Sequence, residues 1–250
     1  MELGVRNDCI AGENLSNKMT IIKDMGYDFL ELALNKEEIS SMESTDIEKY
    51  CNIIQKENFP VKQTSMGHFS FFANKSKKNR QTIISHIKQM IEFTEAINGD
   101  LILLATKEES ENIDSFLKVY QEEFLEAADY AQQKNINLAM EAVGYYKLSL
   151  IDELVRALDH PAVGMYYDMG NCIYGGEDPV KQIKKSIDIM TALHIKGTKD
   201  ISLAQMPLKE IISVINKNNY QGRGCLEIAP DDNSNFHLLK AIKLLKKIGY

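Results

Sequence analysis

The segment Val163-Gly164-Met165-Tyr166-Tyr167-Asp168 decides the fold, because it is a short apolar run that ends in a carboxylate. Its length and its bulky residues predict a buried β-strand. Similar short runs alternate with longer amphipathic stretches along the whole chain, at Glu2–Val5, Phe29–Leu34, Val61–Met66, Leu101–Thr106, Ile136–Ala142, Ala192–Gly197 and Cys225–Ala229. Strands that alternate with helices predict a parallel sheet.

The stretches between these strands have helical periodicity. Apolar residues recur three and four positions apart in residues 83–94, 116–128 and 238–248. Eight strand–helix units in 250 residues leave no second domain, so we expect an α/β fold in which residues 1–250 form one (β/α)8 TIM barrel. An open doubly wound sheet is the competing fold, but it often has a glycine-rich first turn, and Arg6-Asn7-Asp8-Cys9 has no glycine.

Composition argues against several classes of partner. The net charge is −7 and dense Lys/Arg runs are rare, so we expect no nucleic-acid binding. No apolar run reaches the roughly 18 residues of a membrane span. The first residues lack a basic segment followed by an apolar core, and the cysteines form no CxxC pair, so we expect a cytoplasmic protein. A homo-oligomer is neither indicated nor excluded.

Four consecutive strands carry a polar residue near their carboxyl ends, where barrel enzymes place their chemistry. These residues are Glu141, Asp168, His194 and Glu227. Alternation along each strand predicts that they face the barrel interior, because the apolar residues beside them must lie under the helices. The preceding residues on the same face are small in three of the strands, namely Ala139, Ala192 and Cys225, which leaves room for an ion.

Three carboxylates and one imidazole form a ligand set for a divalent metal. Manganese is our first choice, with magnesium, cobalt or zinc as alternatives. Each residue alone could instead be a cap or a member of a core ion pair. Together, three inward carboxylates without a cation would repel one another, which favours a metal site.

Several of these motifs resemble one known family. Tyr166-Tyr167-Asp168-Met169-Gly170-Asn171, His194-Ile195-Lys196, Leu226-Glu227 and Met140-Glu141-Ala142 resemble the sugar phosphate isomerase/epimerase family of xylose isomerase-like TIM barrels. The resemblance implies that Glu141, Asp168, His194 and Glu227 bind the metal and that the two glutamates also act as the catalytic acid/base pair. On the strand that contains His194, the family often has His-x-Lys-Asp, whereas this chain has Gly197 after Lys196 and a displaced Asp200.

The resemblance also implies substrate contacts for His68, in Gly67-His68-Phe69, and for Glu31. A hydrogen bond within the loop is the alternative for His68. Lys196 is expected either to bind a substrate oxygen or to form a salt bridge with a ligand carboxylate. Asn171 is a substrate contact or a turn residue. Arg6, just beyond the first strand, is a candidate for the pocket wall.

The predicted activity is proton transfer next to the carbonyl of a small carbohydrate, through a metal-stabilised enediolate, in an isomerase or epimerase. A dehydratase of the inosose or dehydroshikimate type would use the same site. A non-catalytic sugar-binding barrel is a third possibility. An abasic-site endonuclease would need more histidines for three zinc ions, and Asn171 stands where one of them is expected.

Phosphorylation of the substrate is left open. The acidic loop Pro230-Asp231-Asp232-Asn233-Ser234-Asn235 favours an unphosphorylated sugar, because barrel phosphate sites prefer glycine-rich loops and helix N-termini. The lysines of other loops at the barrel mouth would favour the opposite, namely Lys107, Lys147 and Lys199.

Overall fold

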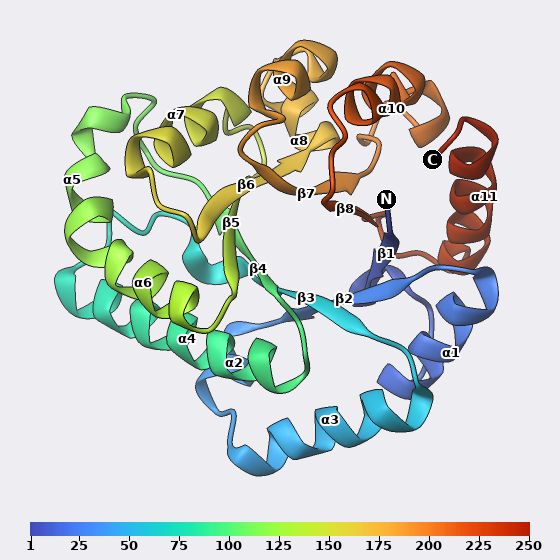
Figure 1. Ribbon diagram of the computed structural model, residues 1–250, viewed down its shortest axis with the longest axis horizontal. Helices are drawn as coiled ribbons and strands as arrows, with labels where there is room; N and C mark the ends of the chain where they lie inside the picture. Colours follow the sequence, from blue (N-terminus) through green and yellow to red (C-terminus); the bar gives the residue numbers. More distant parts are fainter.

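Eight parallel strands close into a barrel in the computed structural model, which describes residues 1–250 (Figure 1). Each strand pairs with its neighbour in the sequence, and β1 closes the ring by pairing with β8. The strands are β1 (Leu3–Arg6), β2 (Phe29–Leu34), β3 (Val61–Met66), β4 (Leu101–Thr106), β5 (Asn137–Ala142), β6 (Val163–Asp168), β7 (Met190–Ile195) and β8 (Arg223–Leu226). The predicted (β/α)8 barrel is confirmed, and the open doubly wound sheet is excluded.

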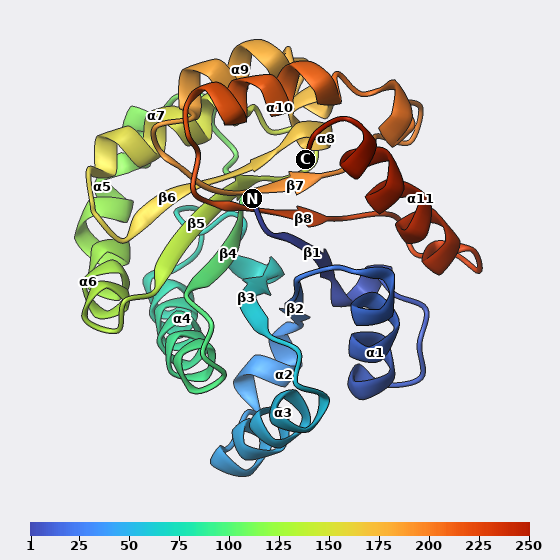
Figure 2. The same ribbon diagram turned by 45° about the vertical axis from the view of Figure 1, so that its right-hand side comes forward.

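Helices surround the barrel on all sides (Figures 1 and 2). The α-helices are α1 (Leu15–Met25), α2 (Lys36–Ser40), α3 (Ser44–Glu57), α4 (Lys77–Ala96), α5 (Leu117–Val119), α6 (Leu125–Gln133), α7 (Leu148–Leu158), α8 (Met169–Tyr174), α9 (Pro179–Ser186), α10 (Leu208–Lys217) and α11 (Ser234–Lys247). Short 3-10 turns are η1 (Asn7–Cys9), η2 (Gly67–Phe69), η3 (Ile113–Ser115) and η5 (Leu203–Gln205), and η4 (Tyr120–Phe124) is a π-turn. None of the helices is long and apolar enough to cross a bilayer.

Four predicted strands, at 29–34, 61–66, 101–106 and 163–168, have the observed bounds. The largest differences are in β7 and β8, which begin and end two or three residues earlier than predicted. Glu227 therefore lies one residue beyond β8, although its backbone N–H still donates to the Ile195 carbonyl at 3.4 Å. This last bond continues the ladder, so the side chain of Glu227 keeps a defined direction.

The barrel wall separates two apolar clusters. The larger one lies between strands and helices and contains 64 buried residues, including Leu138, Met140, Leu193 and Ile195. The smaller one fills the barrel interior with Leu101, Leu103, Ala139, Tyr166 and Ala192. The predicted strand phase is thus confirmed, because apolar residues next to Glu141 and His194 face the helices while small residues share the inner face.

The turn from β6 into α8 is closely packed against the end of β7. The Asp168 side chain caps α8 by accepting a hydrogen bond from the Asn171 backbone N–H at 2.7 Å. A Cβ atom added to Gly170 would lie 2.5 Å from the Gly197 carbonyl oxygen and 2.7 Å from Cγ of Lys196. Only glycine allows this approach without backbone movement, and the approach keeps Lys196 beside Asp168.

Candidate metal centre

The structure brings the four predicted ligand residues together at the carboxyl ends of β5 to β8. Glu141 lies on β5, Asp168 ends β6, His194 lies on β7 and Glu227 follows β8. One candidate ligand atom from each residue lies within 4.8 Å of every other. Glu141, Asp168 and His194 are buried and Glu227 is partly exposed, so the cluster opens toward solvent on the β8 side.

His194 is the centre of this cluster. Its Nδ1 atom lies 2.7 Å from Glu141 Oε1, 3.1 Å from Glu227 Oε2 and 3.5 Å from Asp168 Oδ2. No part of the imidazole is exposed. A single ring nitrogen therefore faces all three carboxylates, as expected if the imidazole and the carboxylates bind the same metal ion.

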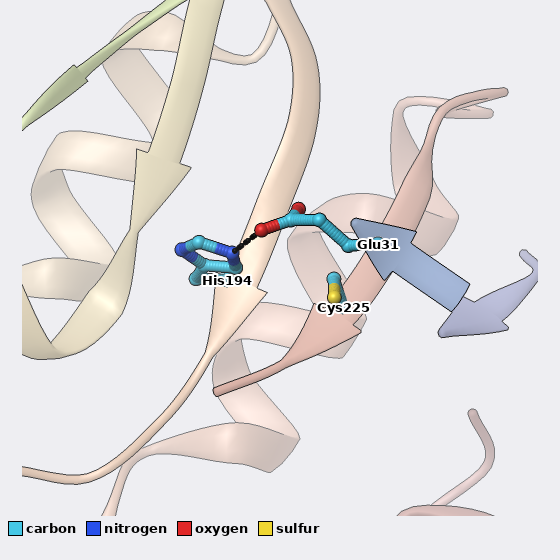
Figure 3. A group of neighbouring side chains, drawn as sticks. All are labelled: Glu31, His194 and Cys225. Atoms are coloured by element: carbon cyan, nitrogen blue, oxygen red, sulfur yellow. Dashed lines mark hydrogen bonds and ion pairs between the residues drawn. The ribbon is translucent and has the colours of Figure 1, made fainter. Parts of the chain in front are cut away.

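The other ring nitrogen of the same imidazole contacts Glu31 on β2 (Figure 3). His194 Nε2 lies 3.2 Å from Glu31 Oε1, while Glu31 Oε2 accepts hydrogen bonds from Gln63 Nε2 at 2.5 Å and from the Tyr166 hydroxyl at 2.8 Å. The Tyr166 ring also packs against His194, with 4.4 Å between ring centroids. Glu31 therefore orients His194 through the ring nitrogen that points away from the cluster, as carboxylates do for many metal-binding histidines.

The Glu31 side chain is fully buried beneath the cluster, and the predicted substrate contact by Glu31 stays a prediction. Glu31, His194 and Cys225 also form a close group that could be considered for a second metal (Figure 3). Burial raises the pKa of the Cys225 thiol to about 12, so this sulfur stays protonated. A thiol in that form is a poor ligand, and the Glu31 oxygens already accept hydrogen bonds from three donors.

Two basic side chains compensate the negative charge of the cluster. Lys196 Nζ lies 2.8 Å from Asp168 Oδ2 and 2.9 Å from Glu227 Oε2. Arg6 lies 3.3 Å from Glu227 Oε1, 3.1 Å from Asp8 and 3.9 Å from Glu31. Of the two roles expected for Lys196, the structure contains the salt bridge to ligand carboxylates. Arg6 is at the edge of the cluster as expected, although a substrate contact by either residue stays a prediction.

The proton affinities in the cluster follow from burial and close charges. Burial raises the pKa of Glu141 to about 7, aided by Asp168 and Glu227 and opposed by His194. Burial alone would lower the pKa of His194, but Tyr166 and the surrounding carboxylates raise it well above its ordinary value. Burial opposes ionisation of Glu227, yet His194 and Lys196 hold its pKa well below the ordinary range. Without an ion, the imidazole of His194 is therefore protonated.

The donor set fits a divalent ion. Asp168 Oδ2 is buried and has no aligned hydrogen-bond donor, although the Lys196 ammonium lies close to it. Glu31 occupies Nε2 of His194, which leaves Nδ1 for the ion. Three carboxylate oxygens and one imidazole nitrogen match the preferences of manganese, magnesium, cobalt and zinc.

The other predicted substrate contacts are His68 and Asn171. His68 Nε2 lies 2.9 Å from His86 Nδ1, so the histidine takes part in a pair with α4. His86 is itself buried. Asn171 is also buried. Its backbone N–H donates to the Asp168 carboxylate, and its side-chain amide makes no hydrogen bond within the chain. Substrate contacts by His68 and Asn171 stay predictions.

Gln63 and Tyr166 are the residues that sequence reasoning missed. Both point into the barrel and meet at the Glu31 carboxylate, with Gln63 Nε2 also 2.6 Å from the Tyr166 hydroxyl. Tyr166 precedes Asp168 by two residues on the same strand, so alternation alone places it on the inner face. That signal was available, but the partner of its hydroxyl comes from the opposite side of the barrel.

A cavity of about 780 Å³ borders the cluster on the β8 side. Lys196 and Glu227 line it next to the cluster, and Asp8 and Cys9 contribute from the end of β1. The loop after β7 and helix α11 form the remaining walls. This volume is typical of small-molecule sites, so the cluster has adjacent space for a substrate.

The closed barrel and its cluster of carboxylates and one histidine define an α/β barrel with a candidate metal centre at the carboxyl ends of its strands. The family model described as xylose isomerase-like TIM barrel matches residues 19–248, and the chain belongs to this family. The predicted family resemblance is therefore confirmed.

Curated relatives of the chain are sugar epimerases. The chain is 22% identical over 212 residues to L-ribulose-5-phosphate 3-epimerase UlaE of Salmonella heidelberg (strain SL476), covering 80% of this chain and 74% of that protein. It is 23% identical over 259 residues to the putative L-ribulose-5-phosphate 3-epimerase SgbU of Haemophilus influenzae, covering 92% and 89%. These relatives support an epimerase or isomerase and do not favour the dehydratase alternative.

Solved structures share the fold across nearly the whole chain. The 3-keto-D-glucoside 4-epimerase YcjR from E. coli has a TM-score of 0.81 at 16% identity and covers 99% of both chains. D-psicose 3-epimerase in the presence of D-fructose has a TM-score of 0.82 at 12% identity and also covers 99% of both. The IOLI protein with a bound zinc atom has a TM-score of 0.77 at 17% identity, covering 99% of this chain and 96% of that one.

Proposed function

We propose that the protein is a divalent-metal-dependent ketose epimerase that moves a proton at the carbon next to the carbonyl. The observation that carries this proposal is the convergence of Glu141, Asp168 and Glu227 on Nδ1 of His194, beside a cavity large enough for a sugar. The names of the relatives add support, because both curated relatives and a structural neighbour are 3-epimerases of ketoses. Carbon 3 is therefore our choice for the reacting centre.

Glu141, Asp168, His194 and Glu227 would hold the ion. When bound, a divalent cation such as manganese makes the carbonyl a better electron sink and stabilises the enediolate. Magnesium, cobalt and zinc suit the same ligands, and the zinc of the IOLI structure is one precedent in this fold. Glu31 orients the imidazole, while Arg6 and Lys196 balance the charge of the carboxylates.

The proton transfers are assigned to Glu141 and Glu227. These residues come from β5 and from the end of β8, so their carboxylates approach the cluster from different strands and can serve opposite faces of a substrate. One carboxylate removes the proton, and the other returns a proton to the opposite face of the same carbon. Return to the adjacent carbon would give an isomerase instead. Lys196, with Nζ 2.9 Å from Glu227, is placed to bind the substrate oxygen next to the reacting carbon.

Deuterium exchange tests the reaction directly. Manganese-loaded protein is incubated in D2O with ketopentoses, with ketohexoses and with their phosphates, and NMR follows the loss of the C3 proton and the formation of the epimer. We expect exchange and epimer formation in the wild type and at least a 100-fold loss in Glu141→Gln and Glu227→Gln. Glu108→Gln is the matched control, because Glu108 is also buried but belongs to no part of the cluster.

The outcomes separate the alternatives. Full turnover in both cluster variants would refute the acid/base assignment. A dehydrated product would identify a lyase, which uses the same first proton abstraction. Tight binding of a sugar without exchange of any proton would identify a non-catalytic binding barrel.

A further inference from the structure

The cavity beside the cluster has two facing walls. One wall is the loop from Lys196 to Ala204, which leads from β7 to η5. The other is one face of α11, where His237, Lys240, Ala241 and Leu244 recur at helical spacing. The loop from Glu227 to Asn233 connects β8 to α11. Glu227 and this face of the helix line the same cavity.

The charged residues of this cavity differ in whether they have an ionic partner. Lys196 and Glu227 pair with each other, and Asp8 pairs with Arg6 at 3.1 Å. Lys199 and Lys240 line the same cavity, one on each wall, and neither forms an ion pair with any carboxylate of the chain. Lys240 only stacks over Phe236, with Nζ 4.3 Å from the ring centroid, and Phe236 is itself exposed. A chain of net charge −7 thus keeps two uncompensated cations facing one cavity.

The carboxylates of the acidic loop after β8 form no ion pair with these two lysines. Neither Asp231 nor Asp232 lines the cavity. Asp231 is engaged in the turn that begins α11, where its backbone N–H and its carbonyl oxygen both bond to the Ser234 hydroxyl and its carboxylate lies 3.5 Å from His237. The sequence argument for an unphosphorylated sugar rests on this loop, whose carboxylates form no ion pair with Lys199 or Lys240.

The lysines of the other loops differ from this pair in position. Lys147 pairs with Glu111 at 2.6 Å, whereas Lys107, like Lys240, has no acidic partner and lies over an aromatic ring, that of Phe71, at 5.3 Å. Neither lines the cavity. Lys199 and Lys240 therefore stand apart from the other lysines considered for the barrel mouth, because they combine a missing acidic partner with a position on the cavity beside Glu227.

We propose that Lys199 and Lys240 bind the terminal phosphate of a phosphorylated ketose whose carbonyl end lies at the metal cluster. This inference rests on the proposed function and names its substrate class. The loops after the seventh and eighth strands are where α/β barrels commonly bind phosphate, and this cavity lies between them. Lysine ammonium groups bind phosphate oxygens by charge-assisted hydrogen bonds, and the Thr198 and Ser202 residues of the loop add hydroxyl groups to the same cavity.

The test compares one ketopentose with and without its 5-phosphate on the manganese-loaded protein. We expect kcat/KM to be at least 100-fold higher for the phosphorylated sugar. Lys199→Met and Lys240→Met should each raise KM for the phosphate ester by about 10- to 100-fold, because each removes one charged contact. Both variants should leave the slow turnover of the free sugar unchanged. Lys147→Met and Lys107→Met are matched controls, because these lysines do not line the cavity.

Calorimetric titration with the ketose phosphate separates this inference from the proposed function. Phosphate-dependent binding that is lost in Lys199→Met and Lys240→Met supports the subsite even if no sugar is turned over, and the absence of turnover would then refute only the epimerase. Equal kcat/KM values for the two sugars would overturn the subsite and leave the epimerase standing. A preference for a sugar carboxylate over the phosphate would overturn the choice of phosphate.

Discussion

Replacing Glu31 by glutamine should weaken metal binding without touching any ligand. The Glu31 carboxylate receives three donors, namely Gln63 Nε2, the Tyr166 hydroxyl and His194 Nε2. A glutamine amide has one oxygen and one NH2 group in the same space, so at least one of these donors loses its acceptor. A buried donor without a partner costs about 1–3 kcal/mol.

The structure offers one way to relieve that cost, and it harms the metal site. If His194 moves its proton from Nε2 to Nδ1, then Nε2 can accept from the new amide. Nδ1 then carries hydrogen and no longer presents a lone pair to the ion. Whether a donor stays unpaired or the His194 proton moves to Nδ1, we expect the affinity for Mn²⁺ to fall by about 10- to 100-fold, which equals about 1.4–2.7 kcal/mol.

Two measurements check this prediction. Titration calorimetry gives the Kd of Mn²⁺, and ¹⁵N NMR of histidine-labelled protein, loaded with diamagnetic Zn²⁺, gives the tautomer of His194. Glu108→Gln is the matched control, since Glu108 is a buried carboxylate that accepts from the Tyr120 hydroxyl at 2.7 Å but lies outside the cluster. A Kd within twofold of the wild type, together with an unchanged tautomer, would refute the positioning role of Glu31.

Three further predictions test other parts of the molecule. Mn²⁺ must displace a proton from His194, whose pKa is raised, so affinity should increase with pH by up to about tenfold per unit, and equal Kd values at pH 6 and pH 8 would contradict this. Burial, aided by His86, lowers the pKa of His68 to about 4, so its neutral form stabilises the fold above about pH 6.5 and this stabilisation is lost toward pH 4. The free energy of unfolding should fall by about 1.5 kcal/mol, a value halved to allow for solvent screening. Urea unfolding of the wild type and of His68→Gln at about pH 6.5 and about pH 4 measures this loss, because the variant lacks the titrating imidazole. Gly170→Ala should cost about 1–3 kcal/mol and lower Tm by several degrees, because the new Cβ meets the Gly197 carbonyl, whereas Gly67→Ala, with nothing within 4 Å, should change Tm little.

The four-residue cluster could be predicted from sequence because strand alternation is a local property. Glu141 and His194 each follow a small residue on the same face, and the apolar neighbours require that face to point inward. Parallel pairing then brings the ends of β5 to β8 to the same side of the barrel. The exact end of β8 did not matter, because Glu227 keeps its ladder hydrogen bond beyond the strand.

The residues beneath the cluster could not be predicted in the same way. Glu31, Gln63 and Tyr166 come from β2, β3 and β6, and their contacts depend on the tilt and shear of the closed barrel. His68 shows a related limit, because its partner His86 lies on a buried face of α4, outside the strands. Side-chain phase follows from sequence, whereas contacts across the barrel require its closed geometry.

The charge balance of the cluster explains why its ligands are accompanied by basic residues. Five carboxylates stand against three cations when every group is ionised, namely Asp8, Glu31, Glu141, Asp168 and Glu227 against Arg6, Lys196 and His194. This leaves two negative charges around the cluster. A divalent ion that displaces the His194 proton adds one net positive charge, so the loaded cluster still carries one negative charge with Arg6 and Lys196 in place. Both of these cations are thereby committed to carboxylates, and an anionic substrate group has to find its counter-charge further out, at Lys199 and Lys240.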